Sequence, residues 1–458
     1  MIRPRPPFLW VVYLVVAAAL AAYAIAAWIG ALLGRAAILY GEGAVANAAR
    51  LARDRVAYLD LDPQRFVAAN YPPLYLHIAS LGDPFVAGRV ASIVSTISVA
   101  ALIFVAARAG GRVFASSLSL GWLALAPVAI WGPAVKPDLV ALALTAAAVL
   151  ILDRRRDLAA VAGFALVFAA LAKPTAILPA VALAVWLAST QREVLVRFVF
   201  GLAVGAVGAA ITIYLDSFPD VWRHVVTWNA LTWSASQAVL LIAVALLVLG
   251  IPAGVAILAG GFKGARAAYG IAALAIIVLG GREGATINYL LDACVAVAFG
   301  LAAIGPRLRA DAVLPVLAVV QLVAGTLALD PLSVVPGRAP TTGAWADPNR
   351  GSGVFFNATA RQLAEDSGVL VRIGIEPVVD DLFLWSRLVE RGTIDAEPVL
   401  AQLRDGRIAT VISEVDLEHL ESAPGYERQR WAKVLVATVL DRYRLEARAG
   451  TLWRYVPR

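Results

Sequence analysis

The sequence contains few of the residues from which redox and metal sites are usually built. Cys294 is the only cysteine among 458 residues, which excludes an intrachain disulfide, a CxxC redox pair and a cysteine-based metal site. The three histidines, His77, His224 and His419, lie far apart in the sequence. A histidine metal cluster is therefore not expected, and we predict no metal ligands.

Charged residues are also scarce. They make up 16% of the chain, and hydrophobic residues make up 61%, whereas a soluble globular protein is about a quarter charged and about half apolar. This composition places most of the chain in lipid. Residues 331–458 hold nearly equal numbers of acidic and basic side chains, so the net positive charge belongs to residues 1–330. Without a basic soluble face, a nucleic-acid partner is excluded.

Long apolar runs separated by short basic clusters predict about eleven transmembrane helices. If every basic cluster faces the cytoplasm, an even number of spans separates neighbouring clusters. The runs 158–189 and 267–304 are each too long for one crossing, and they divide at Lys173-Pro174 and at the polar stretch 280–288. The basic clusters are Arg3/Arg5, Arg108/Arg112, Arg154–Arg156, Arg192/Arg197, Lys263/Arg266 and Arg307/Arg309. The expected spans are 8–34, 86–107, 113–132, 135–152, 158–172, 175–190, 197–214, 237–259, 267–281, 288–305 and 311–329.

We therefore expect an all-α polytopic membrane domain over residues 1–330, with the N-terminus in the cytoplasm. Two outer loops, about 35–85 and 215–236, are substantial, and the second has the tryptophans and amphipathic pattern of an interfacial helix. An odd number of crossings places residues 331–458 outside. There, expected strands at 369–375 and 409–415 and expected helices at 380–391 and 395–404 predict a small extracytoplasmic α/β domain.

Lys136 and Lys173 stand at expected outer helix ends, and a proline follows each of them. Proline suits the first turn of a helix, where free backbone N–H groups and the helix dipole favour an anion. A lysine beside such a helix start is suited to binding a phosphate or pyrophosphate at the membrane surface. The alternative is a lysine that extends to water from a helix end.

Two carboxylates are candidates for catalysis. Glu42 follows the first span and is flanked by Gly41 and Gly43, which allow a sharp turn and leave room for a ligand. In a partly dry cleft it could take the proton of an attacking hydroxyl as a general base; the alternative is a solvated loop carboxylate. Asp138 could orient a substrate or hold a metal, or it could cap its helix or pair with Lys136.

The stretch 70–75, NYPPLY, is a rigid turn in which Tyr71 and Tyr75 could line a sugar or isoprenoid site. The same rings could instead anchor the loop at the membrane interface. Asp60 and Asp62 have the spacing of a sugar-nucleotide metal motif, which is common by chance, and solvated turn carboxylates are the alternative.

Further polar residues stand near expected outer helix ends. Arg89 and Arg282 are candidate phosphate contacts. An ion pair of Arg282 with Glu283 or another acid is the alternative explanation for an arginine at position 282. Asn288 and Tyr289 open the tenth span and are candidates for binding substrate. The remaining polar positions are Asp292, which should face the bundle interior, and the glycosylation sequon at Asn357.

Several motifs occur together in one order: Gly-Glu42-Gly, NYPPLY (70–75), GRVAS (88–92), KPD (136–138), ALAKPTAILP (170–179), TINYLLD (286–292) and LWRYVP (452–457). In this order the chain resembles the bacterial integral-membrane glycosyltransferases of the GT-C superfamily. Within it, the chain is most similar to the branch related to protein O-mannosyltransferases and the lipid A aminoarabinose transferase. The resemblance covers nearly the whole chain. Many relatives have an aspartate or an acidic pair where this chain has Glu42 alone.

The resemblance implies an inverting transfer of a sugar from a polyprenyl-phosphate donor to an extracytoplasmic lipid, polysaccharide or protein. It implies that Glu42 is the base and Asp138 a second acid, and that Lys136, Lys173 and Arg89 contact the donor phosphate. No cofactor is implied with certainty, and a divalent cation is compatible. The expected location is the bacterial inner membrane, with membrane lipids as neighbours. A transporter or flippase of lipid-linked sugars and a sensor or scaffold are the alternative functions.

Overall fold

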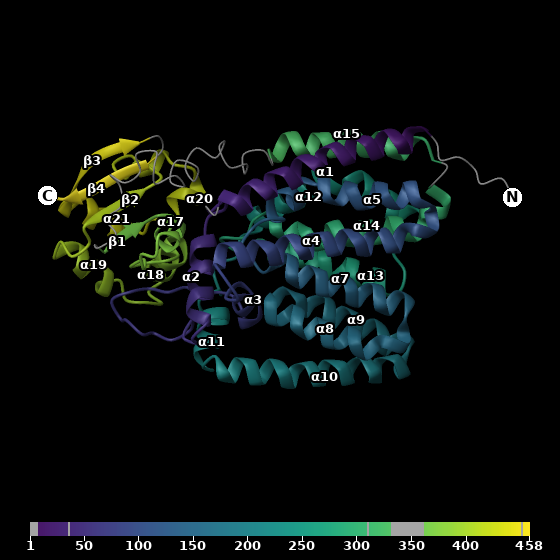
Figure 1. Cartoon of the computed structure of the whole chain (residues 1–458), viewed down its shortest axis with the longest axis horizontal. Helices are drawn as coiled ribbons and strands as arrows, with labels where there is room; N and C mark the ends of the chain where they lie inside the picture. The colour runs from purple at the N-terminus through teal and green to yellow at the C-terminus, as the bar shows by residue number, and fades with distance from the viewer. Residues whose placement is uncertain (1–7, 35–36, 309–310, 331–360, 450–451) are drawn as a thin grey trace.

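The computed structural model describes residues 8–34, 37–308, 311–330, 361–449 and 452–458. Its membrane part is a bundle of roughly parallel and antiparallel helices (Figure 1). These helices are α1 (Phe8–Gly34), α4 (Pro84–Ala107), α5 (Arg112–Ala124), α6 (Ala126–Trp131), α7 (Asp138–Arg154), α8 (Ala159–Ala172), α9 (Ile177–Thr190), α10 (Arg192–Leu215), α12 (Ala235–Leu258), α13 (Ala265–Leu279), α14 (Leu291–Leu308) and α15 (Val313–Leu329).

The helices follow the eleven predicted spans, with α5 and α6 together forming one of them. Pro127 breaks that span because it lacks a backbone N–H, and Leu125 takes an extended conformation before it. The predicted division at Lys173-Pro174 is confirmed, since α8 ends there and α9 begins after a 3-10 turn. Within the described residues, five helices are long and apolar enough to cross a membrane alone, and α9, α13 and α15 are shorter apolar helices. The chain is a polytopic membrane protein.

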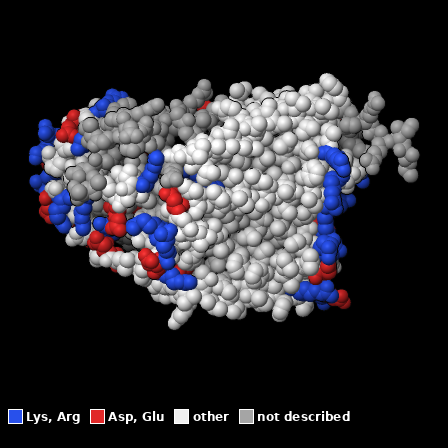
Figure 2. All heavy atoms as spheres, viewed as in Figure 1, with Lys and Arg blue, Asp and Glu red and all other residues white. Residues whose placement is uncertain are grey.

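Charged side chains lie at the two ends of the bundle, and a wide uncharged band separates them on the face shown in Figure 2. At the end remote from the C-terminal domain, Arg266 pairs with Asp153 at 2.8 Å, and Arg154 donates to the carbonyl oxygens of Val105 and Ala106. Arg3, Arg5 and Arg309 lie outside the described residues. The uncharged band is the surface expected to face lipid.

The opposite end carries the outer loops. They contain α2 (Glu42–Ala52), α3 (Pro73–Ala79) and α11 (Asp220–Trp222), which continues into the π-helical turn η4 (Arg223–Thr227). Val221 and His224 are buried while Trp222 is exposed, and the location of this segment in the membrane interface stays a prediction. The 3-10 turns are η1 (Arg108–Gly110), η2 (Arg156–Leu158), η3 (Pro174–Ala176), η5 (Ile287–Leu290) and η8 (Leu420–Ser422).

The C-terminal part is a small α/β domain, as predicted. Its sheet has the order β1-β2-β4-β3, with β1 parallel to β2 and the other neighbours antiparallel. The strands are β1 (Gln362–Ala364), β2 (Thr410–Ser413), β3 (Tyr443–Ala449) and β4 (Leu452–Pro457). The helices are α17 (Gly368–Arg372), α18 (Leu382–Glu390), α19 (Glu397–Arg404), α20 (Gly425–Arg428) and α21 (Lys433–Arg442). The predicted boundary at residue 330 stays a prediction.

The prediction of a strand over residues 369–375 is wrong, because this segment contains helix α17. A short apolar run does not by itself distinguish a strand from a buried helix. Asp366 Oδ1 accepts a hydrogen bond of 2.9 Å from the Gly368 N–H at the first turn, and Gly374, with a φ of 79°, ends the turn. The predicted strand at 409–415 and both predicted helices are confirmed.

The first outer loop and the C-terminal domain share one packed junction. Phe66 and Val379 form a β-bridge, and the Phe66 N–H donates to the Val378 carbonyl oxygen at 2.8 Å. Asp380 accepts hydrogen bonds from Asn47 Nδ2 at 2.9 Å and from the Ala68 N–H at 2.8 Å. Phe66 also belongs to the hydrophobic core of the C-terminal domain. The outer loop is therefore folded against that domain.

Candidate functional site

Lys136 lies in the short segment between α6 and α7, at the end of the bundle covered by the outer loops. Its side chain is 9% exposed. The ammonium group has no hydrogen-bond or ion-pair partner among the described residues, and it lies 5.9 Å from the centre of the Tyr71 ring. A Cβ atom at Gly41 would come within 3.0 Å of it. A buried ammonium without a direct hydrogen-bonded partner is costly, so this position is suited to an anionic ligand.

Asp138 joins two of the other predicted site residues. Its Oδ1 accepts hydrogen bonds from Lys173 Nζ at 2.5 Å and from Asn288 Nδ2 at 2.7 Å. Lys173 also lies 4.9 Å from the centre of the Tyr289 ring. Asp138 therefore pairs with Lys173, and the alternative of a pair with Lys136 is not observed.

Glu42 is fully buried in a closed network. Its Oε1 accepts from the Val135 N–H at 2.7 Å, and its Oε2 accepts from the Ile38 N–H at 2.7 Å and from Arg89 Nη2 at 3.1 Å. Arg89 is equally buried and donates to the Ala31 carbonyl oxygen at 2.9 Å. Glu42 is thus not a solvated loop carboxylate, and in this conformation its oxygens fix the segment that carries Lys136.

The glycines around Glu42 have different surroundings. Gly41 has a φ of 77° and begins the sharp turn that was predicted. Beside Gly43 the space is filled by protein, because a Cβ atom there would lie 2.2 Å from the Gly368 backbone nitrogen. Helix α2 and the C-terminal domain therefore touch backbone to backbone at this point.

The remaining predicted binding residues lie around this end of the bundle. Tyr75 is fully buried, and its hydroxyl donates to the Gly88 carbonyl oxygen at 3.1 Å, which is a packing contact. Arg282 donates to the Asn229 carbonyl oxygen at 2.7 Å and makes no ion pair with any described acid. Burial raises the pKa of the Tyr71 hydroxyl well above its ordinary value. Asp138 and Tyr289 raise this pKa further, and Arg282 lowers it. Their roles as substrate contacts stay predictions.

Other polar residues of the sequence pattern lie apart from Lys136. Asp62 forms an ion pair with Arg65 at 3.3 Å, as a turn carboxylate would. Asp292 accepts a hydrogen bond from the Tyr269 hydroxyl at 2.9 Å inside the bundle. Asn357 lies outside the described residues. Within the described part of the chain, no group of three or more histidine, cysteine, aspartate or glutamate residues is placed to hold a metal ion.

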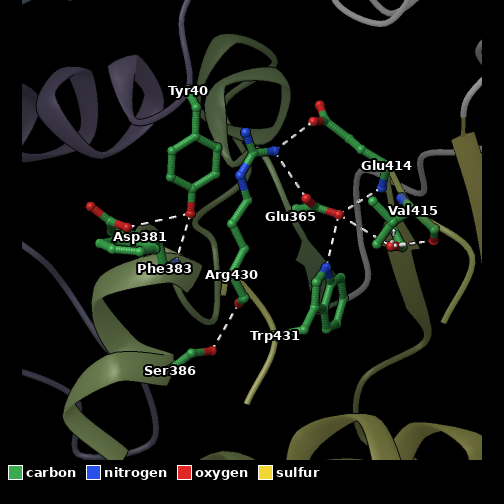
Figure 3. Close-up of polar contacts among 10 residues, drawn as sticks. Tyr40, Glu365, Asp381, Phe383, Ser386, Glu414, Val415, Arg430 and Trp431 are labelled. Carbon is green, nitrogen blue, oxygen red and sulfur yellow. Dashed lines mark hydrogen bonds and ion pairs between the residues drawn. The ribbon is translucent and has the colours of Figure 1, made fainter. Parts of the chain in front are cut away.

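The C-terminal domain brings residues to this site that the sequence patterns did not indicate. Tyr40 accepts a hydrogen bond from the Phe383 N–H at 2.8 Å, and its hydroxyl donates to Asp381 Oδ1 at 3.3 Å (Figure 3). Arg430 lies 4.1 Å from the centre of the Tyr40 ring and pairs with Glu365 at 3.0 Å. The one sequence feature that could have indicated these residues is the acidic pair 380–381, which stands before an amphipathic helix.

Burial raises the carboxyl pKa values in this region of the C-terminal domain. The pKa of Asp381 is raised by desolvation, against the lowering effects of the Leu384 N–H and Lys136. Desolvation also raises the pKa of Asp366 to about 6 and that of Glu414 to about 8. These groups therefore bind protons more readily than ordinary carboxylates.

A groove of about 380 Å³ separates the two outer loops from the C-terminal domain. Arg50, Asp60, Trp228 and Glu376 contribute to its lining, together with Ile394. Lys136, Lys173 and Asp138 do not line it. The groove is therefore separate from the residues predicted to bind the donor.

No protein-family model and no curated protein matches the sequence. Two solved structures are similar to this one: ArnT from Cupriavidus metallidurans in the apo state (TM-score 0.62, 17% sequence identity) and the same protein bound to undecaprenyl phosphate (TM-score 0.61, 16% identity). Each match covers 97% of this chain and 97% of the other. The predicted resemblance to the GT-C branch that includes the lipid A aminoarabinose transferase is confirmed at the level of the fold.

Proposed function

We propose that this protein is a membrane glycosyltransferase that moves a sugar from a polyprenyl-phosphate carrier to an extracytoplasmic acceptor. The observation that carries the proposal is Lys136, a nine-tenths buried ammonium that makes no direct ion pair with a described residue. A similar fold in a protein that binds undecaprenyl phosphate supports the choice of anion. The sugar and the acceptor (lipid, polysaccharide or protein) are not part of the proposal.

In the proposed reaction Lys136 holds the donor phosphate, and Arg282, which makes no ion pair with a described acid, adds positive charge. Lys173 and Arg89, also predicted as phosphate contacts, are paired with Asp138 and Glu42 in this conformation. The acceptor oxygen attacks the anomeric carbon as the bond from that carbon to the phosphate oxygen breaks, which inverts the configuration. Positive charge at the phosphate stabilises the polyprenyl phosphate that leaves. A carboxylate takes the proton of the acceptor hydroxyl, and Glu42 and Asp138 are the residues predicted from the sequence for this role.

We also propose that the protein lies in the bacterial inner membrane with Phe8 near the cytoplasm and the C-terminal domain outside. The basic loops at the end remote from that domain support this orientation. A transporter of lipid-linked sugars would place its polar groups near the bilayer midplane. Here Lys136, Asp138 and Lys173 lie at helix ends instead, which favours the enzyme.

Binding of undecaprenyl phosphate to purified protein in detergent tests the proposal, with intrinsic tryptophan fluorescence as the readout. Replacing Lys136 by Met removes hydrogen bonds to a charged group worth about 1.5–3 kcal/mol, so we expect the dissociation constant to rise roughly 10- to 150-fold. Lys263→Met, at the other end of the bundle, is the matched control and should bind normally. Failure of the wild-type protein to bind undecaprenyl phosphate would refute the proposal. Equal binding by Lys136→Met would remove Lys136 from the site.

A further inference from the structure

Four carboxylates act on the charge of Lys136: Asp381, Glu42, Asp138 and Asp366. Two of them belong to the membrane part of the chain and two to the C-terminal domain. A general base must offer an oxygen that the acceptor hydroxyl can reach. The four carboxylates differ in whether they have such an oxygen.

The two carboxylates of the membrane part are engaged by other groups. Both oxygens of Glu42 accept hydrogen bonds, three in total, and the residue is fully buried. Asp138 Oδ1 is shared by Lys173 and Asn288. Its Oδ2 accepts no hydrogen bond from a described residue, but it is sealed from solvent. Neither residue presents a reachable oxygen in this conformation.

Asp381 has a different arrangement. Its Oδ1 accepts from the Tyr40 hydroxyl at 3.3 Å and from the Leu384 N–H at 3.0 Å, which caps helix α18. Its Oδ2 accepts no hydrogen bond from any residue that the structure describes, and the residue is 6% exposed, against 3% for Asp138 and none for Glu42. The carboxylate is thus held in place by one oxygen. Tyr40, which binds that oxygen, is followed in the chain by Gly41, where a Cβ atom would lie 3.0 Å from Lys136 Nζ, so the carboxylate and the ammonium flank the same turn.

We infer that Asp381, a residue of the C-terminal domain, is the general base that takes the proton from the acceptor hydroxyl. The inference rests on the proposed function. As the acceptor oxygen forms its bond to the anomeric carbon, the hydroxyl proton passes to Asp381 Oδ2 and the bond from that carbon to the phosphate oxygen breaks. Polyprenyl phosphate leaves with the electron pair of that bond, beside Lys136.

This assignment divides the site between the two parts of the protein. The lysines that attract the donor phosphate belong to the membrane helices, and the base belongs to the outer domain, where an extracytoplasmic acceptor arrives. Burial raises the pKa of Asp381, which makes it a better proton acceptor once ionised. Asp366 lies across a β-bridge from Asp381, but its Oδ1 accepts from the Gly368 N–H, and it is Asp381 that Tyr40 binds beside Lys136.

Asp381 and its neighbour Asp380 form a matched pair for the test. Asparagine at 381 can still cap α18 and accept from Tyr40, so Asp381→Asn removes the base and keeps the contacts. Each oxygen of Asp380 accepts a separate donor, from Asn47 and from Ala68. An asparagine at 380 has only one acceptor atom, so Asp380→Asn should lower stability through a lost contact.

The experiment uses the purified full chain and measures undecaprenyl phosphate binding, thermal stability, and sugar release from a panel of undecaprenyl-phosphate monosaccharides with detergent-extracted membrane acceptors. For Asp381→Asn we expect normal binding and melting, a transfer rate lower by roughly 10²- to 10⁴-fold, and partial rescue by added formate. For Asp380→Asn we expect a lower melting temperature and no increase of the transfer rate on addition of formate.

Three results would overturn the inference. Wild-type transfer by Asp381→Asn would leave the enzyme proposal intact and remove Asp381 as base. A loss confined to Glu42→Gln, Asp138→Asn or Asp366→Asn, with rescue by formate, would give the role to that residue. If the wild-type protein neither binds undecaprenyl phosphate nor releases any sugar from the panel, the proposed function fails and the inference fails with it.

Discussion

Replacing Gly43 by Ala tests whether the outer loop and the C-terminal domain are held together as closely as the structure shows. The new Cβ atom would lie 2.2 Å from the Gly368 nitrogen and 2.5 Å from the Gly368 Cα, where an ordinary contact needs at least 3.4 Å. Both of these atoms are backbone and cannot rotate away, although the third close atom, Ser367 Oγ at 2.5 Å, belongs to a side chain. The domain must move by about 1 Å, and overpacking of this kind costs about 1–3 kcal/mol.

The same movement should reduce activity more than stability. It draws the C-terminal domain, and Asp381 with it, away from Lys136. A misplacement of about 1 Å at a reacting centre can lower a rate by roughly 100-fold. We therefore expect Gly43→Ala to bind undecaprenyl phosphate nearly as well as the wild-type protein and to transfer sugar about 100-fold more slowly.

Thermal melting and the transfer assay on purified protein would measure both effects. Gly425→Ala is the matched control, because a Cβ atom at Gly425 meets no atom within 4 Å. A Gly43→Ala protein with unchanged melting and transfer would refute the close backbone contact between α2 and α17. A variant that loses donor binding entirely would show instead that the junction shapes the phosphate site.

Two further predictions concern buried charge. Arg89→Met leaves Glu42 as an unpaired buried carboxylate, so it should destabilise the protein by about 3–5 kcal/mol, and adding Glu42→Gln should recover part of that loss; additive losses in melting experiments would contradict the ion pair. Burial raises the pKa of Glu414 to about 8, with Glu365 and Asp366 raising it further and Arg430 opposing them. The folded protein then binds this proton more tightly than the unfolded chain. The resulting stability is fully present below the ordinary pKa of about 4.5 and is lost as the pH rises through about 8. The melting temperature should therefore be higher at pH 6 than at pH 8.5, and Glu414→Gln should reduce this difference; an identical difference in both proteins would exclude Glu414 as its source.

The membrane helices were predictable because each crossing requires a long apolar run, and the basic loops fix which ends lie together. The parity of the loops placed the break at Lys173-Pro174 correctly. The segment 369–375 was mispredicted because its apolar, β-branched residues suit a buried strand or a buried helix equally. The hydrogen bond from the Gly368 N–H to Asp366 at the start of α17 is not visible in that pattern.

The site was predictable only in part. Local patterns pointed to Lys136, Asp138 and Lys173, since a polar residue at a helix end in a membrane protein is conspicuous. No local pattern indicates that Tyr40 meets Asp381, which is 341 residues further along the chain. For the same reason, the burial of Glu42 against Arg89 followed from tertiary packing and could not be read from the glycines beside Glu42.

The junction between the first outer loop and the C-terminal domain also sets an order in time. The Ala68 N–H can form its hydrogen bond only after Asp380 has been synthesised, 312 residues later. At about 5–20 residues per second this interval is roughly 15–60 s. During that interval the loop lacks the partner that covers Phe66 and Asn47. A ribosome that stops before Asp380 would therefore leave a membrane-inserted chain in which Asn47 and Ala68 lack their hydrogen-bond acceptor and Phe66 lacks the core it packs against.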